Sequence, residues 1–267
     1  MQHAPNNPPS VTPRPPDSPG KTLVIVPAYN ESASVAHVVN DLHKHLPRAD
    51  VLVVDDGSTD GTHQAVPDHT PVLRLPFNLG IGAAMQAGYR YASIHNYDFA
   101  LQVDGDGQHP ADQAHKLISA LVETHADLVI GSRFLPDNTG DTNNTHDPNY
   151  KPPATRAAGI GVIRAFVRLL TGLRITDCTS GFRACNRGVI QAFARWYPED
   201  YPEPQVIPLL HRAGFTIHET PVTMRPRTTG QTSIPFLKGV FYILKVGFAL
   251  LLDLSRSPWP KKKANQP

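Results

Sequence analysis

The feature that most constrains the fold is a regular alternation of short apolar runs with amphipathic stretches between residues 21 and 134. The apolar runs are TLVIVPAYN, VLVVDDGS, PVLRLPFN, FALQVDGDG and ADLVIGSRF, and apolar positions recur at helical spacing over 31–46, 79–95 and 110–125. Continuous runs of valine, isoleucine and leucine predict strands buried on both faces, and their alternation with helices indicates a mostly parallel sheet. The sequence therefore predicts an α/β fold with helices flanking one sheet.

Polar side chains directly follow four of these apolar runs. In a mostly parallel sheet the C-terminal ends of the strands line the ligand crevice, so we expect these residues to lie near one another. The four groups are residues 29–31, 55–58, 104–108 and 131–133.

The rest of the chain divides into a tail, a loop and further elements. Residues 1–20 are rich in proline and nearly lack large apolar side chains, which predicts a disordered tail. The stretch LPDNTGDTNNTHDPNYKPP after Phe134 predicts a long loop, followed by a helix over 154–171. A short helix after TDCTSGFRACNR, the segment PQVIPLLHRAG and the strand-like FTIHETPVTMRPR follow. We predict one main domain over 21–233 and a separate C-terminal segment over 234–267.

The C-terminal segment is strongly apolar over 240–252, interrupted by Lys245. It is too short and too interrupted to cross a bilayer comfortably, which requires about 20 apolar residues. We expect an amphipathic helix at the membrane surface, with Lys238, Lys245 and Arg256 near the head groups. The alternative is a helix that packs on the domain or against a small membrane protein.

Composition adds few constraints. The net charge of +2 over 267 residues gives no indication of nucleic-acid binding. Cys178 and Cys185 form neither a paired metal-ligand array nor a disulfide framework, which indicates free thiols in a reducing setting. The N-terminus lacks the apolar core of a signal peptide. We therefore expect the catalytic part in the cytoplasm, peripheral on the inner face of the cell membrane.

The stretch DGDG at residues 104–107 places two carboxylates close together after an apolar run. Gly105 allows a turn that directs Asp104 and Asp106 at one cation, and Mg²⁺ or Mn²⁺ would remove their repulsion and accept further oxygen ligands from Gln108 and a diphosphate. An ordinary turn explains the same residues equally well. An EF-hand loop is excluded because the later ligands are missing.

Two further groups indicate a nucleoside site. Asp56 can accept hydrogen bonds from a ribose or a base, Tyr29 can stack on a base, and Glu31 can hydrogen-bond it. A phospho-receiver domain also has an acidic strand end, but this does not account for the other groups. A dinucleotide fingerprint should directly follow the first strand, where this chain has PAYNE, so NAD binding is disfavoured.

Taken together, the motifs resemble those of family 2 glycosyltransferases. VPAYNES, VVDDGSTDGT, NLGIGAAMQAGYRYA, QVDGDGQHP, VIGSRF, TSGFRACNR and RPRTTGQTS occur in the order seen in that family. The chain looks most like the polyprenyl-phosphate sugar transferases, typified by dolichyl-phosphate mannose synthase, over residues 21–233. The resemblance implies a Rossmann-like GT-A fold, a nucleoside-diphosphate sugar donor and a divalent cation.

The resemblance also implies roles for individual residues. Those at the donor would be Pro27, Tyr29, Glu31, Val54, Asp56, Asp104, Gly105, Asp106, Arg227 and Ser233. Asp104, Asp106 and Gln108 would hold the metal. The family pattern often ends in Ser-Lys where this chain has Thr232-Ser233, so one cationic contact is expected to be absent.

The acceptor decides the mechanism. A polyprenyl phosphate already carries an anionic oxygen, so in-line attack with inversion would need positioning and metal assistance rather than a strong base. Arg133, Arg156 and Arg183 could hold its phosphate, because guanidinium groups match phosphate oxygens. Asp104, Asp106, Arg133 and Asp177 are the predicted catalytic residues.

Two alternatives remain open. A transferase that acts on a hydroxyl of a glycan or lipid-linked saccharide would need a base, and Asp177 is the first candidate, although a loop cap explains it equally well. Glu199, Asp200 and Glu203 are weaker candidates for the same role. An inactive subunit that only binds sugar nucleotides within a membrane assembly is the other.

Overall fold

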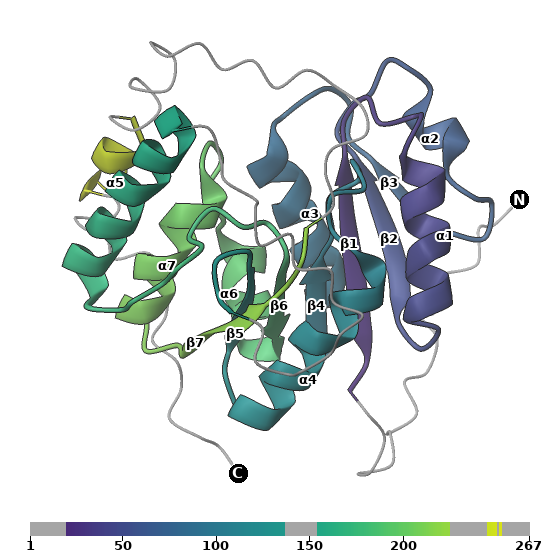
Figure 1. Cartoon of the computed structure of the whole chain (residues 1–267). Coiled ribbons are helices and arrows are strands. Elements are labelled where there is room, and N and C mark those ends of the chain that lie inside the picture. Colours follow the sequence, from purple (N-terminus) through teal and green to yellow (C-terminus); the bar gives the residue numbers. More distant parts are fainter. Residues whose placement is uncertain (1–19, 137–153, 225–244, 250, 253–267) are drawn as a thin grey trace, which may run out of the picture.

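The computed structural model describes residues 20–136, 154–224, 245–249 and 251–252, in which helices surround one sheet (Figure 1). The seven strands follow the order β3-β2-β1-β4-β6-β5-β7. Their bounds are β1 Thr22–Ala28, β2 Asp50–Asp55, β3 Val72–Arg74, β4 Phe99–Gln102, β5 Leu128–Ser132, β6 Arg183–Asn186 and β7 Ile217–Pro221. All strand pairs are parallel except those of β6 with β4 and β5. The prediction of a mostly parallel sheet is confirmed.

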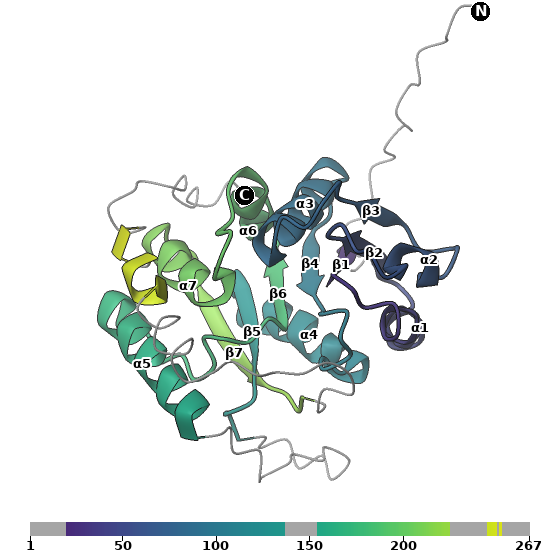
Figure 2. The same ribbon diagram turned by 90° about the horizontal axis from the view of Figure 1, so that it is seen from above.

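Helices cover both faces of the sheet (Figure 2). On one face pack α1 and α4, and on the other α3, α5, α6 and α7. The helix bounds are α1 Val35–His45, α2 Thr62–Ala65, α3 Ile81–Ile94, α4 Ala114–Thr124, α5 Ala154–Thr171, α6 Arg187–Arg195 and α7 Pro202–Arg212, and a 3₁₀ turn over Ala111–Gln113 precedes α4. The helices predicted over 31–46, 79–95, 110–125 and 154–171 correspond to α1, α3, α4 and α5.

The apolar runs in the sequence are explained by the helices on both faces of the sheet. Successive side chains of a strand point to opposite faces. In β1, Leu23 and Ile25 therefore join the core beneath α3, whereas Val24 and Val26 join the core beneath α1 and α4. Because neither face meets solvent, no polar residue interrupts the run.

The sequence did not predict β6 as a strand. It has only four residues and contains Arg183 and Asn186, so it shows no apolar run. Its antiparallel pairing brings the segment 177–182 between the C-terminal ends of β4 and β5, because Gln102 pairs with Arg183 and Ile130 also pairs with Arg183.

The described part of the C-terminal segment, 245–249 and 251–252, is helical. Val246 is fully buried in the core that includes α5 and α7. Lys245 Nζ lies 3.9 Å from Asp200 Oδ2. Phe248 and Leu251 face outward. No helix within the described ranges is long and apolar enough to span a bilayer. All but the last residue of the predicted tail lies outside those ranges, as does most of the predicted C-terminal segment, and the two boundaries between the three predicted segments stay predictions.

Candidate active site

Three neighbouring strands bring the first groups of predicted residues to one edge of the sheet. Tyr29 follows β1, Asp56 follows β2 and Asp104 follows β4, and β1 lies between β2 and β4. The backbone N–H of Asp56 donates to the Ala28 carbonyl at 2.9 Å, and that of Gly105 donates to the Pro27 carbonyl at 3.2 Å. The predicted nucleoside and metal residues are therefore adjacent.

The loop after β1 is fixed by side chains of the loop after β2. The N–H of Asn30 donates to Ser58 Oγ at 2.9 Å, and Asn30 Oδ1 accepts from the N–H of Thr59 at 3.0 Å. The N–H of Glu31 donates to Thr62 Oγ1 at 2.9 Å. These bonds leave the Tyr29 side chain 45% exposed at the rim, where its ring could stack on a base.

The adjacent acids Asp55 and Asp56 have different partners. Asp56 is buried, and its two carboxylate oxygens accept from the N–H groups of Leu79 and Gly80 at 2.8 and 2.9 Å, which fixes the loop before α3. Asp55 Oδ1 accepts from the Ser58 N–H at 3.0 Å, and Oδ2 lies 3.3 Å from Arg74 Nε. Both acids thus shape the edge on which a nucleoside would lie.

Two other predicted donor residues contribute little side-chain surface. The side chain of Val54 is fully buried beneath α3, and Pro27 is buried within β1. Any contact between a nucleoside and either residue would therefore be made by backbone atoms.

The DGDG stretch forms a turn after β4, as the metal hypothesis requires. The Asp104 side chain is 36% exposed, and its Oδ1 accepts from Gln102 Nε2 at 3.1 Å. Asp106 and Gln108 contact each other twice, through Oδ1 to the Gln108 N–H at 3.0 Å and through Oδ2 to Nε2. Two of the three side chains predicted to share a cation, Asp106 and Gln108, are therefore in direct contact, and Asp104 lies two residues earlier in the same turn.

His109 supports this turn and was not among the predicted site residues. Its Nδ1 accepts from the Asp104 N–H at 2.9 Å, so the neutral ring carries its proton on Nε2, which is 3.7 Å from Asp104 Oδ2. The ring stacks on Phe182 with centroids 5.0 Å apart. The hydrogen bond to the Asp104 backbone therefore helps to fix the turn that carries the two aspartates.

The donor set fits a hard divalent cation that is completed by a substrate. Two carboxylates and an amide supply oxygen ligands of the kind Mg²⁺ and Mn²⁺ prefer. Across the described residues no group of three or more His, Cys, Asp or Glu side chains could hold a metal by itself. Diphosphate oxygens would therefore have to provide the remaining ligands.

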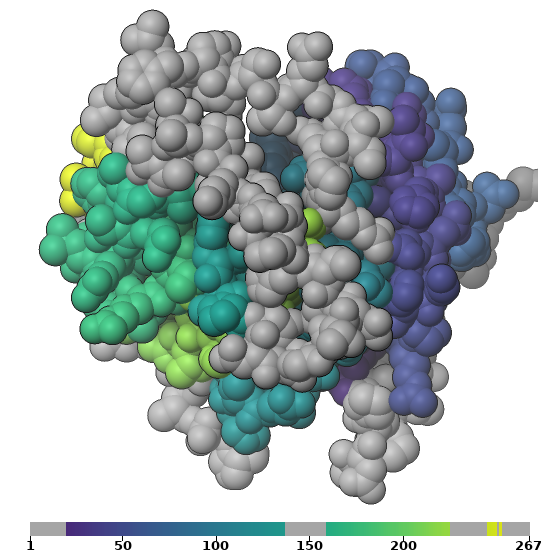
Figure 3. Space-filling model, in the orientation of Figure 1, coloured from purple at the N-terminus to yellow at the C-terminus, as the bar shows by residue number. Residues whose placement is uncertain are grey.

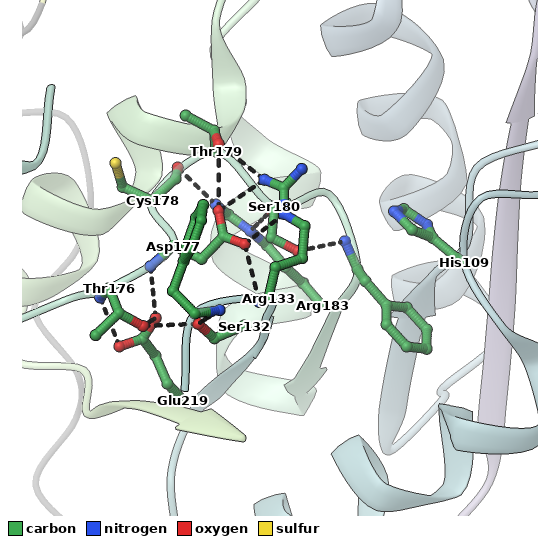
Figure 4. A network of polar contacts seen from close by, with 12 residues as sticks. His109, Ser132, Arg133, Thr176, Asp177, Cys178, Thr179, Ser180, Arg183 and Glu219 are labelled. Atoms are coloured by element: carbon green, nitrogen blue, oxygen red, sulfur yellow. Dashed lines mark hydrogen bonds and ion pairs between the residues drawn. The ribbon is translucent and has the colours of Figure 1, made fainter. Parts of the chain in front are cut away.

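Arg133 and Asp177, which were predicted separately, form a buried ion pair (Figure 4). Arg133 Nε and Nη2 donate to the two oxygens of Asp177 at 2.7 and 2.8 Å, and Nη2 also donates to Thr179 Oγ1 at 3.0 Å. Asp177 is fully buried. The carboxylate thus orients the guanidinium in this structure, and its role as a base stays a prediction.

Behind the pair lies Glu219, which the sequence analysis missed. Its carboxylate accepts from the N–H groups of Thr176 and Asp177 at 2.7 and 2.8 Å and from Thr176 Oγ1 at 2.9 Å. Ser132 Oγ contacts Thr176 Oγ1 at 2.6 Å. The only signal for Glu219 was an acidic residue within the strand-like FTIHETPVT.

Of the three arginines predicted for the acceptor phosphate, Arg133 directly follows β5 and Arg183 begins β6. Arg156 lies in α5, but its side chain is outside the described parts of the structure, as are Arg227 and Ser233. Cys178 and Cys185 are free, as predicted, and both are buried. Burial, with a further contribution from Asp177, raises the pKa of Cys178 to about 12, so this thiol is not a nucleophile at neutral pH.

The sheet order, the DGDG turn and the arginine at the end of β5 define a protein of the GT-A-like class. Glucosyl-3-phosphoglycerate synthase from Mycobacterium tuberculosis, solved with Mn²⁺, UDP and phosphoglyceric acid, matches with a TM-score of 0.63 at 19% identity, over 88% of this chain and 78% of that chain. Mannosyl-3-phosphoglycerate synthase from Rubrobacter xylanophilus matches with a TM-score of 0.64 at 17% identity, over 93% and 79%. Both show a shared fold.

The chain belongs to the family described as Glycosyl transferase family 2, which residues 23–193 match. It is 31% identical to polyprenol monophosphomannose synthase from Mycolicibacterium smegmatis, over 88% of this chain and 90% of that protein. It is also 31% identical to undecaprenyl-phosphate mannosyltransferase from Micrococcus luteus, over 80% and 87%. The predicted family is confirmed, and the chain is a glycosyltransferase.

Proposed function

We propose that the protein transfers a sugar, with inversion, from a nucleoside-diphosphate sugar to a polyprenyl phosphate at the cytoplasmic face of a membrane. The observation that carries the proposal is the position of Arg133. Asp177 fixes its guanidinium group, and the segment 177–182 lies between the end of β5, which Arg133 follows, and the end of β4, which the DGDG turn follows. The similarity to two transferases named for polyprenyl and undecaprenyl phosphate acceptors supports the acceptor class.

The donor would lie along the ends of β2, β1 and β4. Tyr29 and Asp56 flank the nucleoside position, and Asp104, Asp106 and Gln108 would hold Mg²⁺ or Mn²⁺ together with the diphosphate. When bound, such a cation stabilises the negative charge that develops on a leaving diphosphate.

The acceptor needs orientation more than activation. A phosphate oxygen of the lipid forms the new bond to the anomeric carbon while the bond from that carbon to the diphosphate breaks, so no proton has to be removed. Arg133 would hold the acceptor phosphate by charge-assisted hydrogen bonds. Because both oxygens of Asp177 already bind Arg133, the phosphate acceptor is favoured over a hydroxyl acceptor that requires Asp177 as base.

The membrane contact that we propose would involve α5 and the described C-terminal helix, which occupy the same flank of the molecule (Figure 3). Leu169 is 81% exposed, and Val162, Phe248, Leu251 and Leu252 are also exposed. A groove of about 810 Å³ that Leu169 lines is also lined by Arg164, Arg168 and Arg174. Exposed apolar side chains together with cationic ones suit an interface that carries anionic head groups.

The test is a direct transfer assay. The purified full chain would be incubated with Mn²⁺ and, in turn, GDP-mannose, UDP-glucose and UDP-N-acetylglucosamine, with a short-chain polyprenyl phosphate as acceptor and the matching unphosphorylated polyprenol as control. We expect the mass of one glycolipid from the phosphate only. No product with any donor, or product from the polyprenol alone, would overturn the proposal.

A further inference from the structure

The groove on α5 is formed by the helix and by the chain that follows it. Helix α5 packs Ile163 and Val167 into the core, so the other side of the helix faces outward. Gly172 ends the helix, because its φ is +74° and its N–H donates to the Arg168 carbonyl at 2.7 Å. Residues 173–176 then provide the second wall of the groove.

The first wall leaves room because two of its residues are small. Gly161 and Ala165 lie one turn apart on α5, and Leu169 continues the same line of the helix. A Cβ atom added to Gly161 would meet nothing within 4 Å. Leu169 is 81% exposed. An apolar group could therefore lie against this line of side chains.

Three arginines give the groove a strong positive charge. Arg164 and Arg168 lie one turn apart on α5, and Arg174 belongs to the second wall. All three are exposed, and among the described residues no acidic side chain pairs with them. No acidic residue is among the described residues that line the groove. The groove therefore favours an anion, and guanidinium groups match phosphate oxygens in particular.

One end of the groove adjoins the arginine that we assign to the acceptor phosphate (Figure 4). Thr176 lines the groove, and its hydroxyl lies 2.6 Å from that of Ser132 and donates to Glu219 at 2.9 Å. The next residue, Asp177, binds Arg133 through both carboxylate oxygens. A ligand in the groove would therefore sit at a fixed place relative to Arg133.

Exposed apolar side chains continue from the groove to the C-terminal helix. A Cβ atom added to Gly247 would lie 3.7 Å from the Phe166 ring of α5, so the two helices are neighbours at one edge of the molecule (Figures 1 and 2). Val162 and Leu169 are exposed on α5, and Phe248 is exposed on the C-terminal helix. Arginines beside exposed apolar side chains are typical of a surface that contacts an anionic bilayer.

We propose that the groove binds the head group of an anionic phospholipid of the bilayer, with the lipid phosphate at Arg164, Arg168 and Arg174 and the acyl chains beside Leu169. None of the described residues that line the groove is a predicted donor residue or Arg133, so this lipid is not the acceptor. The inference deepens the membrane contact of the proposed function and rests on it. It adds a lipid that is bound but not consumed, and that holds the active site at a fixed height above the membrane.

The first test measures binding to vesicles by flotation. The groove variant replaces the three arginines of the groove with glutamine. The control variant removes the same charge from exposed residues outside the groove, by Lys44→Gln, Arg48→Gln and Arg195→Gln. The vesicles contain phosphatidylcholine alone or equal parts of phosphatidylcholine and phosphatidylglycerol.

We expect the wild type to prefer the anionic vesicles and the groove variant to bind them about 100-fold more weakly, since each arginine near a charged membrane surface contributes about 5-fold. The control variant should lose less than about 3-fold. Equal losses in the two variants would show an effect of net charge, and they would overturn the inference, as would equal binding of the wild type to both kinds of vesicle.

A second measurement needs no variant. The wild type would be titrated in a calorimeter with monomeric dihexanoyl phosphatidylglycerol, dihexanoyl phosphatidylcholine and inorganic phosphate. We expect saturable binding of one phosphatidylglycerol per chain and none of phosphatidylcholine. Binding of inorganic phosphate as tight as that of phosphatidylglycerol would indicate a general phosphate site and would overturn the assignment to a phospholipid.

Transfer kinetics separate this site from the acceptor site. With a polyprenyl phosphate in anionic vesicles, the groove variant should have an acceptor KM raised about 10-fold or more and an unchanged kcat, as for loss of uniform binding. With a water-soluble short-chain polyprenyl phosphate and no vesicles, both constants should stay within about 2-fold of the wild type. Equal losses in the two assays would place the acceptor in the groove and overturn the inference. A wild type that binds anionic vesicles through the groove but transfers no sugar would overturn the proposed function alone.

Discussion

The two halves of the candidate site are held in different ways. The nucleotide half comprises residues 27–32, 54–60, 78–80 and 104–109, where backbone N–H groups donate to side-chain atoms such as those of Asp56 and Ser58, and where the ion pair of Asp55 involves the half-exposed Arg74. The arginine half comprises residues 131–134, 176–183 and 219, where the buried ion pair of Arg133 with Asp177 is supported by Glu219.

The difference predicts different costs of substitution. A single hydrogen bond contributes about 0.5–1.5 kcal/mol to stability between neutral groups and about 1.5–3 kcal/mol when one group is charged. Removing one member of a buried ion pair leaves an uncompensated charge and costs about 3–5 kcal/mol. Substitutions in the nucleotide half should therefore affect ligand binding more than folding, whereas those in the arginine half should affect both.

The largest effect is expected at the DGDG turn. Replacing Asp106 with asparagine removes a carboxylate from the proposed cation site, so turnover should fall by about 10³ to 10⁴-fold, which corresponds to about 4–5.5 kcal/mol. The melting temperature should change little. Initial rates and Mn²⁺ binding, followed by water-proton relaxation, measure the two effects. Unchanged Mn²⁺ affinity would contradict the metal assignment.

The ion pair tests the arginine half. Asp177→Ala should lower the free energy of unfolding by about 3–5 kcal/mol, because the largely buried guanidinium of Arg133 would lose its hydrogen bonds to both oxygens of this carboxylate. Urea unfolding measures this loss. The double variant Arg133→Met with Asp177→Leu should recover much of the stability but none of the transfer activity. If Asp177→Ala lowers the free energy of unfolding by less than about 1 kcal/mol, the two halves of the site do not differ in the cost of substitution.

Gly57 is expected to be the exception in the nucleotide half, because its substitution should affect folding and not only ligand binding. Its φ is +68°, and an added Cβ would lie 2.4 Å from the Phe77 backbone carbonyl carbon. Gly57→Ala should therefore cost about 2 kcal/mol or more in thermal or urea unfolding. Gly161→Ala is the matched control, since Gly161 is in α5 and its added Cβ meets nothing within 4 Å. It should stabilise the protein by about 0.5–1 kcal/mol.

Asp56→Asn should have a smaller effect. An asparagine side chain can accept from only one of the N–H groups of Leu79 and Gly80, and its own amide would face the other. We expect a loss of about 1–2 kcal/mol in stability and a fall in nucleotide affinity of about 10-fold. Titration calorimetry with UDP and GDP would measure the fall, and unaltered affinity for both would show that the loop before α3 plays no part in binding.

The smallest effect concerns the two thiols. Burial raises the pKa values of Cys178 and Cys185, so both remain protonated and enclosed at pH 8. We expect iodoacetamide to label neither in the native protein within an hour, and both in urea, as intact mass would show. Rapid native labelling of Cys178 would mean that the arginine half opens readily.

The nucleotide half was predictable because its residues follow consecutive apolar runs. Parallel strands end at the same edge, so Tyr29, Asp56 and Asp104 could be placed together without knowledge of distant contacts. Their individual hydrogen bonds were not predictable. The backbone partners of Asp56 depend on the course of the loop before α3, which carries no pattern of its own.

The arginine half depends on pairings between distant parts of the chain. Arg133 and Asp177 were each identified, but the contact between them spans 44 positions and requires the antiparallel β6. Glu219 lies opposite Ile130 only because β7 pairs with β5. Neither pairing follows from periodicity, since β6 is short and polar at both ends.

The antiparallel direction of β6 also lets one segment of the chain contribute to two parts of the site. One stretch from Asp177 to Arg183 reaches from the ion pair at β5 to the partner of Gln102 on β4. Side chains alternate faces along a strand, so a one-residue shift in the pairing of β6 would turn Arg183 toward α1 and α4 and away from α7. An insertion within β6 should therefore be far more damaging than one in the loop that connects Asp177 to it.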